Sequence, residues 1–388
     1  MVVSFRVFKK SSPNSKLTIY LGRRDFVDHV SETDPVDGVL LVDNDYLAGR
    51  QIYAQLVCSF RYGREEDETM GLNFKKELTL ADEQVYPPTQ HNPSLTRLQE
   101  RLMKKLGPSS FPFNFTFPRH SPTSVTLQPG EDSQASPCGV EYFVRCYVLE
   151  TDKERSHRRS AVSLAIRKIQ YAPTKPGRQP CTVVRKDFMF SPGELELEAT
   201  LDRQLYHHGD TVSVNVCIKN NSNKAVKKIS VSILQCIDIA MFTGGHAKAR
   251  VASVETTEGC PVEPGSSMQK VIKLAPALKN MRDRFGIALD GRLKGEDTDL
   301  ASSTLLADEN SRDIFGMVIS YTAKVKLFLG AIGGELAAEL PFVLMHPKPN
   351  MKRIIKADTL AEVEGFNASM DDPTCDPSNE MDKLSVKG

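Results

Sequence analysis

Glu194-Leu-Glu-Leu-Glu-Ala-Thr-Leu201 is a stretch in which polar and apolar residues alternate without interruption. The same period of two recurs in Thr211-Val-Ser-Val-Asn-Val-Cys-Ile218 and in Met317-Val-Ile-Ser-Tyr-Thr-Ala-Lys-Val-Lys-Leu327. Such alternation predicts strands with one face on a core and the other in water. Turn-forming clusters such as His207-His-Gly-Asp210 separate the strands. The sequence therefore predicts an all-β fold built from antiparallel, immunoglobulin-like sandwiches.

One segment, Thr96-Arg-Leu-Gln-Glu-Arg-Leu-Met-Lys-Lys-Leu106, predicts a short amphipathic helix instead. Its three leucines recur every four residues and so share one face. Thr96 and Gln99 fit a capping box, and Gly107-Pro108 ends the helix. The opposite face carries four basic residues, and a face of this kind is usually just solvated.

The 388 residues divide at a linker rich in proline, Ala172-Pro-Thr-Lys-Pro-Gly-Arg-Gln-Pro180. We therefore expect an N-terminal sandwich domain over residues 1–172, a hinge linker over 173–180 and a C-terminal sandwich domain over 181–350. Residues 356–388 hold eight acidic and three basic side chains and no strand pattern. This composition predicts a flexible acidic tail over 351–388.

Charge and cysteine usage limit the compartment and the partners. The chain has 50 Lys and Arg against 49 Asp and Glu, a net charge of +1, so nothing in its overall charge favours a nucleic-acid partner. The first ten residues lack the apolar core of a signal peptide, and no stretch approaches the ~18 apolar residues of a membrane span. The eight cysteines form no C-x-x-C pair and are interpreted as reduced thiols in a cytoplasmic protein.

No motif for catalysis is present: the sequence has no G-x-S-x-G, P-loop, H-E-x-x-H or G-x-G-x-x-G pattern. His207 and His208 are the only adjacent histidines. Adjacent side chains on a strand point to opposite faces, so the pair makes a poor joint metal site, and a turn at a strand start is the better interpretation. A metal-dependent enzyme that uses one of them lacks a second ligand cluster in the sequence.

The most distinctive segment is Phe60-Arg-Tyr-Gly-Arg-Glu-Glu-Asp-Glu-Thr-Met-Gly-Leu-Asn-Phe-Lys-Lys-Glu-Leu78. Two strand patterns flank an acidic loop bounded by glycines. The loop is either simply solvated or an exposed finger that enters a partner's cavity. The residues of this candidate finger loop are Tyr62, Gly63, Arg64, Glu65, Glu66, Asp67, Glu68, Thr69, Met70, Gly71 and Leu72.

This loop resembles the signature of the arrestin family, F-R-Y-G followed by acidic residues and then M-G-L-x-F. Thr69 replaces the aliphatic residue usual at its position. Further matching motifs run in order along the chain: Val7-Phe-Lys-Lys10, Tyr20-Leu-Gly-Arg-Arg-Asp-Phe-Val-Asp-His29, Pro35-Val-Asp-Gly38, Ile166-Arg-Lys168, Tyr206-His-His-Gly209, Gly286-Ile-Ala-Leu-Asp-Gly291, Leu300-Ala-Ser-Ser-Thr304 and Pro341-Phe-Val-Leu-Met-His-Pro347. The sequences of these motifs are most similar to those of visual arrestins of invertebrate photoreceptors.

The resemblance implies two sandwich domains and an adaptor function without catalysis or a required cofactor. It implies a cytoplasmic protein of photoreceptor cells that binds light-activated, phosphorylated rhodopsin, or a related receptor, at the membrane. Such an adaptor ends signalling because it blocks the G protein. The alternatives within the same group are a nonvisual arrestin and an arrestin-like trafficking scaffold that serves several receptors.

The resemblance also implies a buried charge cluster that holds the two domains in a resting orientation, with Asp25, Arg167, Asp290 and Asp297 at the matching positions. Buried charges are costly unless they are paired, and one arginine among three carboxylates is under-compensated. A dianionic receptor phosphate would compete for Arg167 through charge-assisted hydrogen bonds. The cluster is therefore expected to act as a phosphate-sensing switch.

Basic residues at family positions imply two further sites. The receptor-phosphate groove is expected at Lys9, Lys10, Arg24, Lys105 and Lys294. A patch for inositol phosphates or phosphoinositides is expected at Lys224, Lys227 and Lys228. Two apolar loops predict an edge that touches the membrane, through Phe188, Met189, Leu329 and Ile332; the competing interpretation is two strand ends with core side chains.

The tail departs from the family pattern. Residues 360–372 contain one aromatic residue, Phe366, and no arginine follows Arg353. We therefore expect a weak latch of the tail on the N-terminal domain. The same stretch argues against a clathrin-adaptor contact and a strong endocytic role.

Overall fold

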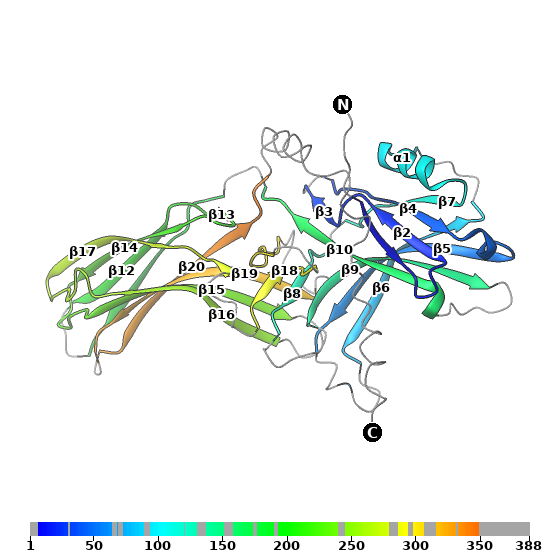
Figure 1. Cartoon of the computed structure of the whole chain (residues 1–388). Helices are drawn as coiled ribbons and strands as arrows, with labels where there is room; N and C mark the ends of the chain where they lie inside the picture. Colours follow the sequence, from blue (N-terminus) through cyan, green and yellow to red (C-terminus); the bar gives the residue numbers. More distant parts are fainter. Residues whose placement is uncertain are drawn as a thin grey trace, which may run out of the picture.

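The structure is a computed structural model, and the residues that it describes are 7–29, 32–63, 68, 73–88, 94–119, 121–129, 137–150, 158–173, 177–189, 193–239, 245–278, 286–293, 298–305, 316–330 and 333–348. The expected tail, 351–388, lies outside these ranges. Two strand-rich lobes lie side by side, the N-terminal one carrying the helix (Figure 1). The expected all-β class with one short helix is confirmed.

The N-terminal lobe consists of two sheets and the helix. Its strands are β1 (Phe8–Ser11), β2 (Leu17–Leu21), β3 (Asp25–Asp28), β4 (Val36–Val42), β5 (Arg50–Arg61), β6 (Lys75–Tyr86), β7 (Ser110–Phe115), β8 (Val125–Leu127), β9 (Gly139–Glu150) and β10 (Ala161–Gln170). One sheet has the order β1-β2-β4-β7; the other runs β8-β9-β10-β3, with β5 and β6 continuing from β9. Short 3-10 helices occupy Asn44–Tyr46 and Arg158–Ser160. Apolar side chains from both sheets form one core between them.

The helix α1 (Arg97–Leu106) packs against β4 and β7 on the outside of the first sheet (Figure 1). The predicted capping box is present, because the Thr96 hydroxyl accepts from the backbone of Gln99 and the Gln99 side chain accepts from the backbone of Thr96. Gly107 ends the helix with a φ of 90°, a conformation that glycine adopts without steric cost. Local sequence therefore predicted the start and the end of this element.

The C-terminal lobe is a second sandwich. Its strands are β11 (Cys181–Asp187), β12 (Glu194–Leu201), β13 (Leu205–His207), β14 (Val212–Asn220), β15 (Lys228–Ile239), β16 (Gly245–Thr256), β17 (Ser266–Leu274), β18 (Ala288–Asp290), β19 (Met317–Phe328) and β20 (Glu335–Met345). The sheets have the orders β11-β12-β14-β17 and β13-β20-β19-β15-β16. The alternation predicted for β12, β14 and β19 is the observed burial pattern. Each fully buried aliphatic side chain of these strands contributes roughly 1.5–3 kcal/mol.

Two parallel pairs depart from the expected antiparallel arrangement. Strand β3 pairs in parallel with β10, and β13 pairs in parallel with β20. Both β3 and β13 are short edge strands, of four and three residues. The long central pairs, β5 with β9 and β15 with β19, are antiparallel as expected.

The two lobes are joined by backbone pairing as well as by the linker. Strand β18 of the C-terminal half pairs with β8 of the N-terminal half, so it extends the larger N-terminal sheet. A second joint lies where Tyr171 forms a parallel bridge with His346 and the Ala172 N–H donates to the His346 carbonyl at 3.0 Å. In Figure 1, β8 and β18 lie between the lobes. Side chains on these strands are therefore placed to sense the relative position of the lobes.

Candidate functional site

The candidate site is centred on an ion pair beside the joint. Arg167 of β10 lies opposite Asp25 of β3 in the parallel register. Its Nε and Nη2 donate to the two carboxylate oxygens of Asp25, each at 2.7 Å, which is bidentate geometry. The Arg167 side chain is 10% exposed and that of Asp25 is 37% exposed. The arginine is therefore buried, whereas its carboxylate partner is open to solvent on one side.

Arg167 also reaches across the joint. Its Nη1 donates to the backbone carbonyl of Gly291 at 3.2 Å, directly after β18. Gly291 is in close contact with the N-terminal lobe, because a Cβ added there would lie 2.6 Å from Cβ of Ser124 and 3.1 Å from Cγ of Arg167. The Gly291 N–H donates to the Ser124 carbonyl at 3.2 Å. A glycine at this position permits the close approach of the two lobes.

Asp290 lies in the same joint but has partners of its own. Its Oδ1 accepts from the Ser302 N–H at 2.7 Å, and its Oδ2 accepts from the Ser302 hydroxyl at 2.9 Å. Nε2 of His208 is 3.5 Å and Nε2 of His346 is 2.5 Å from Oδ2. The expectation that Arg167 is the only group available to compensate Asp290 is therefore wrong, since Ser302 donates to both carboxylate oxygens and two histidines lie against Oδ2.

The two histidines also explain the titration of this group. Burial disfavours the ionised carboxylate of Asp290, but the contacts with His208 and His346 outweigh burial and lower its pKa well below the ordinary value. Burial likewise works against the charged form of His346, yet the adjacent Asp290 carboxylate raises the His346 pKa. The His346 Nε2 nevertheless has no partner with hydrogen-bond geometry among the described residues. The short contact is thus one of charge and proximity.

His207 and His208 diverge, as expected for adjacent residues. His207 lies 3.4 Å from Asp210, whereas His208 turns to Ser302 and Asp290. His346 is the histidine that lies against His208, with ring centroids 4.6 Å apart. The signal for this pairing was weak: each histidine merely follows a strand.

Asp297 and Lys294 lie outside the described residues, so their expected places in the cluster and in the groove stay predictions.

Sequence reasoning gave no role to Lys168. This buried lysine follows Arg167 on β10 and points to the opposite face, where its Nζ donates to Asp28 at 2.7 Å and to the Ser121 carbonyl at 2.9 Å. Burial lowers its pKa although Asp28 acts in the other direction. A lysine in the middle of an alternating strand was the available signal.

The expected phosphate-binding residues fall into two places. Lys9 and Lys10 lie on the edge strand β1, opposite Tyr20 and Ile19. Arg24 lies beside them, since its guanidinium is 5.8 Å from the Phe8 ring and its Nε donates to the Ala165 carbonyl on β10. The Arg24 carbonyl in turn accepts from the Arg167 N–H at 2.7 Å. These cations therefore lie along a line from the edge strand β1 to Arg167.

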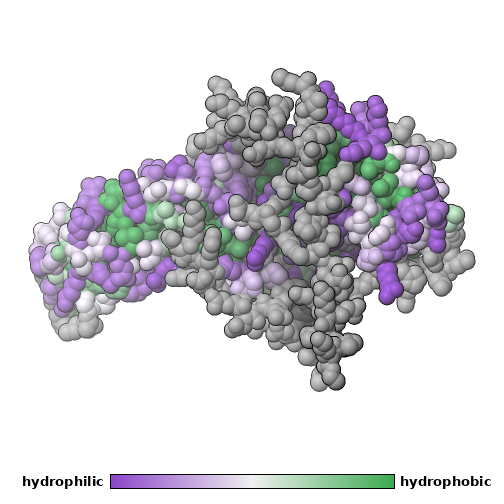
Figure 2. All heavy atoms as spheres, in the orientation of Figure 1, coloured by the Kyte–Doolittle hydropathy of each residue, from purple (hydrophilic) through white to green (hydrophobic). Residues whose placement is uncertain are grey.

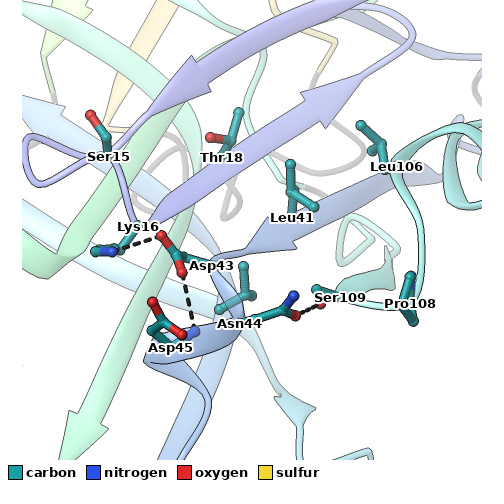
Figure 3. A pocket seen from close by; sticks show the side chains of 11 residues that line it. Ser15, Lys16, Thr18, Leu41, Asp43, Asn44, Asp45, Leu106, Pro108 and Ser109 are labelled. Carbon is teal, nitrogen blue, oxygen red and sulfur yellow. Dashed lines mark hydrogen bonds and ion pairs between the residues drawn. The ribbon is translucent and has the colours of Figure 1, made fainter.

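Lys105 lies apart from that group. It is exposed in the last turn of α1, and α1 packs on β4 and β7, at the edge of the sheet opposite β1. An open pocket of about 520 Å³ lies next to this helix end, lined by Leu106, Leu41 and Ser109 among others (Figure 3). Its lysine, Lys16, is already paired with Asp43 at 2.7 Å.

The finger loop is described only at its base. Residues 64–67 and 69–72 lie outside the described residues, whereas Tyr62, Gly63 and Glu68 are placed. Glu68 is not a free acid, because its Oε1 accepts from Arg61 at 3.0 Å and from the Phe74 N–H at 3.2 Å. The Phe74 ring occupies the space that a Cβ on Gly63 would need, 2.4 Å away. A packed base between β5 and β6 thus carries the loop.

The three lysines of the expected inositol-phosphate patch are not equivalent. Lys228 is paired with Glu255 at 2.6 Å and lies over the Phe328 ring. Lys227 is exposed, and its N–H donates to the Phe328 carbonyl at 2.8 Å. The Lys224 carbonyl accepts from the buried Asn220 side chain at 2.7 Å, which holds this turn in place. The turn is thus anchored by a buried side chain, and the charge of Lys228 is already matched.

The expected membrane edge is only partly available. Met189 is 85% exposed, and Phe188 is half-buried against the C-terminal core. Leu329 is buried in that core, so the expectation that it contacts a membrane is wrong; its N–H is bonded in a tight turn to the Gly334 carbonyl. Ile332 lies outside the described residues. In Figure 2, hydrophilic residues cover much of both lobes, and smaller hydrophobic areas lie among these hydrophilic residues.

Across the described ranges, the one α-helix is too short and too polar to cross a bilayer.

Comparison with known proteins gives a consistent result over nearly the whole chain. Residues 17–172 match the family profile described as "Arrestin (or S-antigen), N-terminal domain", and residues 191–349 match "Arrestin (or S-antigen), C-terminal domain". The chain is 59% identical over 367 residues to "Arrestin homolog" of Heliothis virescens, covering 94% of this chain and 96% of the relative. It is 56% identical over 359 residues to "Phosrestin-2" of Drosophila melanogaster, covering 92% and 99%. It is 51% identical over 349 residues to "Arrestin, lateral eye" of Limulus polyphemus, covering 90% and 86%.

Proposed function

The chain belongs to the arrestin family, and from that premise we propose that it is a non-catalytic adaptor for light-activated, phosphorylated rhodopsin or a related receptor. It ends signalling because it occupies the receptor surface that the G protein needs. The similarity to a relative named for the lateral eye supports the visual assignment. The observation that carries the proposal is the bidentate pair of Arg167 and Asp25 at the joint of the two lobes.

The pair has the properties that a phosphate sensor requires. A phosphate with close to two negative charges offers Arg167 the same bidentate hydrogen bonds as Asp25, with more charge. Asp25 is partly exposed, so it can be rehydrated when the arginine leaves. Departure of Arg167 also removes its bond to the Gly291 carbonyl across the joint. Phosphate capture is thereby coupled to loosening of the two lobes.

A basic path guides the phosphate to this point. Lys10 is exposed on the edge strand β1, and Arg24 lies between β1 and β10. Exposed cations at a sheet edge attract anions over about a Debye length, ~8 Å at physiological ionic strength. The path therefore raises the local concentration of receptor phosphates beside Arg167.

The loop between β5 and β6 enters the receptor. A packed base with the Arg61–Glu68 ion pair holds this loop, whose residues 64–67 and 69–72 lie outside the described residues. We expect that replacing 64–67 and 69–72 by Gly and Ser, with Glu68 retained, abolishes receptor capture and leaves Tm nearly unchanged. Glu68→Gln is the matched control: it should lower Tm and retain capture. A clearly lower Tm of the loop-replacement variant would mean that the loop packs on the protein and does not enter the receptor.

Lipid contacts add to receptor binding without a required cofactor. Met189 is the exposed apolar group of the membrane edge, with Phe188 behind it. Lys224 and Lys227 bind the headgroup of a phosphoinositide or a soluble inositol phosphate, and Lys228 supports them from its pair with Glu255. The protein is cytoplasmic in photoreceptor cells and moves to the receptor membrane in light.

The deciding experiment is sedimentation of the full chain with photoreceptor membranes in the dark and in light, with and without phosphatase treatment. Binding that requires light and falls after phosphatase treatment is the expected result. Equal binding in the dark and in light would contradict the visual assignment. Light-dependent binding that is the same with and without phosphatase treatment would support the receptor role but contradict the phosphate switch.

A further inference from the structure

Three side chains with metal-ligand chemistry converge beside the joint from distant parts of the chain. His208 follows β13, Asp290 ends β18 and His346 follows β20. Their donor atoms, two imidazole Nε2 atoms and a carboxylate oxygen, lie within 4.8 Å of one another. None of the three is part of the Arg167–Asp25 pair. The cluster therefore calls for a separate explanation.

The spacing of the donors suits a small tetrahedral ion. Zn²⁺ bonds to imidazole nitrogen and carboxylate oxygen at roughly 2.0–2.2 Å, which puts the ligand atoms of a tetrahedral site about 3.3 Å apart. Nε2 of His208 is 3.5 Å from Oδ2 of Asp290. The Ser302 hydroxyl lies 3.2 Å from that nitrogen and 2.9 Å from the same oxygen. Three of the separations are thus close to those of a coordination shell.

His346 supplies the observation that points most directly to a ligand. Its Nε2 is buried and faces Asp290 at 2.5 Å, yet it has no partner with hydrogen-bond geometry among the described residues. A buried polar atom without a partner is costly. An ion placed between this nitrogen, Nε2 of His208 and the carboxylate would give His346 a partner and relieve the short contact. The His346 side chain is 20% exposed, which leaves an entry path.

We propose that His208, Asp290 and His346 bind a divalent transition-metal ion of the zinc type, with water or the Ser302 hydroxyl in the fourth position. Two imidazoles and one carboxylate favour Zn²⁺ over Mg²⁺ and Ca²⁺, which prefer all-oxygen sites. The Ser302 N–H orients the carboxylate, as the outer partners of metal ligands commonly do.

The ion would fasten the joint. Asp290 belongs to β18, which pairs with β8 of the N-terminal lobe, and the His346 backbone pairs with Tyr171 and Ala172. Coordination would tie both interlobe contacts to the turn at His208. Metal binding therefore stabilises the observed arrangement of the lobes. This inference stands independently of the proposed receptor function.

The test uses the full chain after removal of bound metal with a chelator. Zn²⁺ is titrated at mildly alkaline pH, where imidazole is deprotonated, in competition with a chromogenic chelator. The variants are His346→Gln and His208→Gln, and the matched controls are His207→Gln, on the neighbouring residue, and His246→Gln, on an exposed histidine. We expect one equivalent of Zn²⁺ in the wild type and both controls, with binding weakened at least ~10-fold in each site variant.

Two further readouts decide the identity of the site. Co²⁺ in place of Zn²⁺ should give tetrahedral visible bands without the intense near-ultraviolet band of thiolate coordination. Zn²⁺ should raise Tm in the wild type and the controls, and neither Mg²⁺ nor Ca²⁺ should do so. Absence of stoichiometric Zn²⁺ binding, a thiolate band, or unchanged affinity in His208→Gln would each overturn the proposal. If His346→Gln does not fold, His208→Gln and the wild-type Co²⁺ spectrum decide.

Discussion

Replacement of Arg167 by glutamine removes the charge of the joint ion pair and leaves a shorter polar side chain. Breaking a buried pair costs ~3–5 kcal/mol, and an exposed pair contributes at most about 1 kcal/mol. Here the arginine is 10% exposed but Asp25 is 37% exposed, so the carboxylate that is left behind can be hydrated. The bond from Arg167 to the Gly291 carbonyl is lost as well. We therefore expect a loss of ~1–3 kcal/mol, between the two limits.

The same free energy sets the functional effect. If the pair holds the resting arrangement, its removal should raise affinity for light-activated, unphosphorylated receptor by roughly 5–150-fold, which corresponds to ~1–3 kcal/mol of coupling. Unfolding in urea measures the stability, and sedimentation with phosphatase-treated membranes measures the affinity. Phosphatase treatment matters because the variant should no longer need the phosphate that competes for Arg167.

Arg185→Gln is the matched control. Arg185 is also paired with a carboxylate, Glu196, at 2.7 Å, but its side chain is 58% exposed and lies on β11, away from the joint. This substitution should leave stability nearly unchanged and keep the phosphate requirement intact. Equal behaviour of the two variants, or a stable Arg167→Gln protein with unaltered phosphate dependence, would refute the reasoning.

Three other substitutions test the joint, the basic path and the membrane edge. Gly291→Ala should destabilise the chain by ~1–3 kcal/mol in urea unfolding, because its Cβ would lie 2.6 Å from Ser124, whereas Gly245→Ala, with 3.6 Å of clearance, should be nearly neutral. Lys9→Ala combined with Lys10→Ala should weaken binding to phosphorylated receptor more than to unphosphorylated receptor, and a difference that does not shrink at high salt would contradict a charge-guided path. Met189→Ser should reduce co-sedimentation with liposomes without lowering Tm; unchanged liposome binding would remove this residue from the membrane edge.

The long strands and the helix could be predicted from the sequence because each depends on residues that lie close together in the chain. In β12 the leucines are buried and the glutamates face outward, and Glu196 meets Arg185 and Lys219 on the neighbouring strands. A shift of one residue would exchange the two faces, so the alternation also fixes the register. The helix was equally predictable, because its cap and its end depend on side chains within a few residues.

The joint could not be predicted in this way. Strand β18 has three residues, all buried, and its partner β8 also has three, which is too short for a period to be recognised. Pairing of these strands depends on how two complete sandwiches meet. The burial of Leu329 has a related cause: the β19–β20 turn folds its side chain into the core, whereas sequence alone leaves both directions open.

Asp290 lies at a position that matches the charge cluster of the family, but the match does not identify the groups that contact its carboxylate. The sequence places an acid there, but only the packed structure brings His208, Ser302 and His346 around it. In the described contacts, the two acids of the joint thus have different partners: Asp25 has Arg167, and Asp290 has Ser302 and two histidines. A phosphate that captures Arg167 would therefore release Asp25 and the Gly291 carbonyl, while Asp290 keeps its own partners. The joint would lose the bond from Arg167 to the Gly291 carbonyl but keep the pairing of β8 with β18, which favours rotation of the lobes about that strand over their separation.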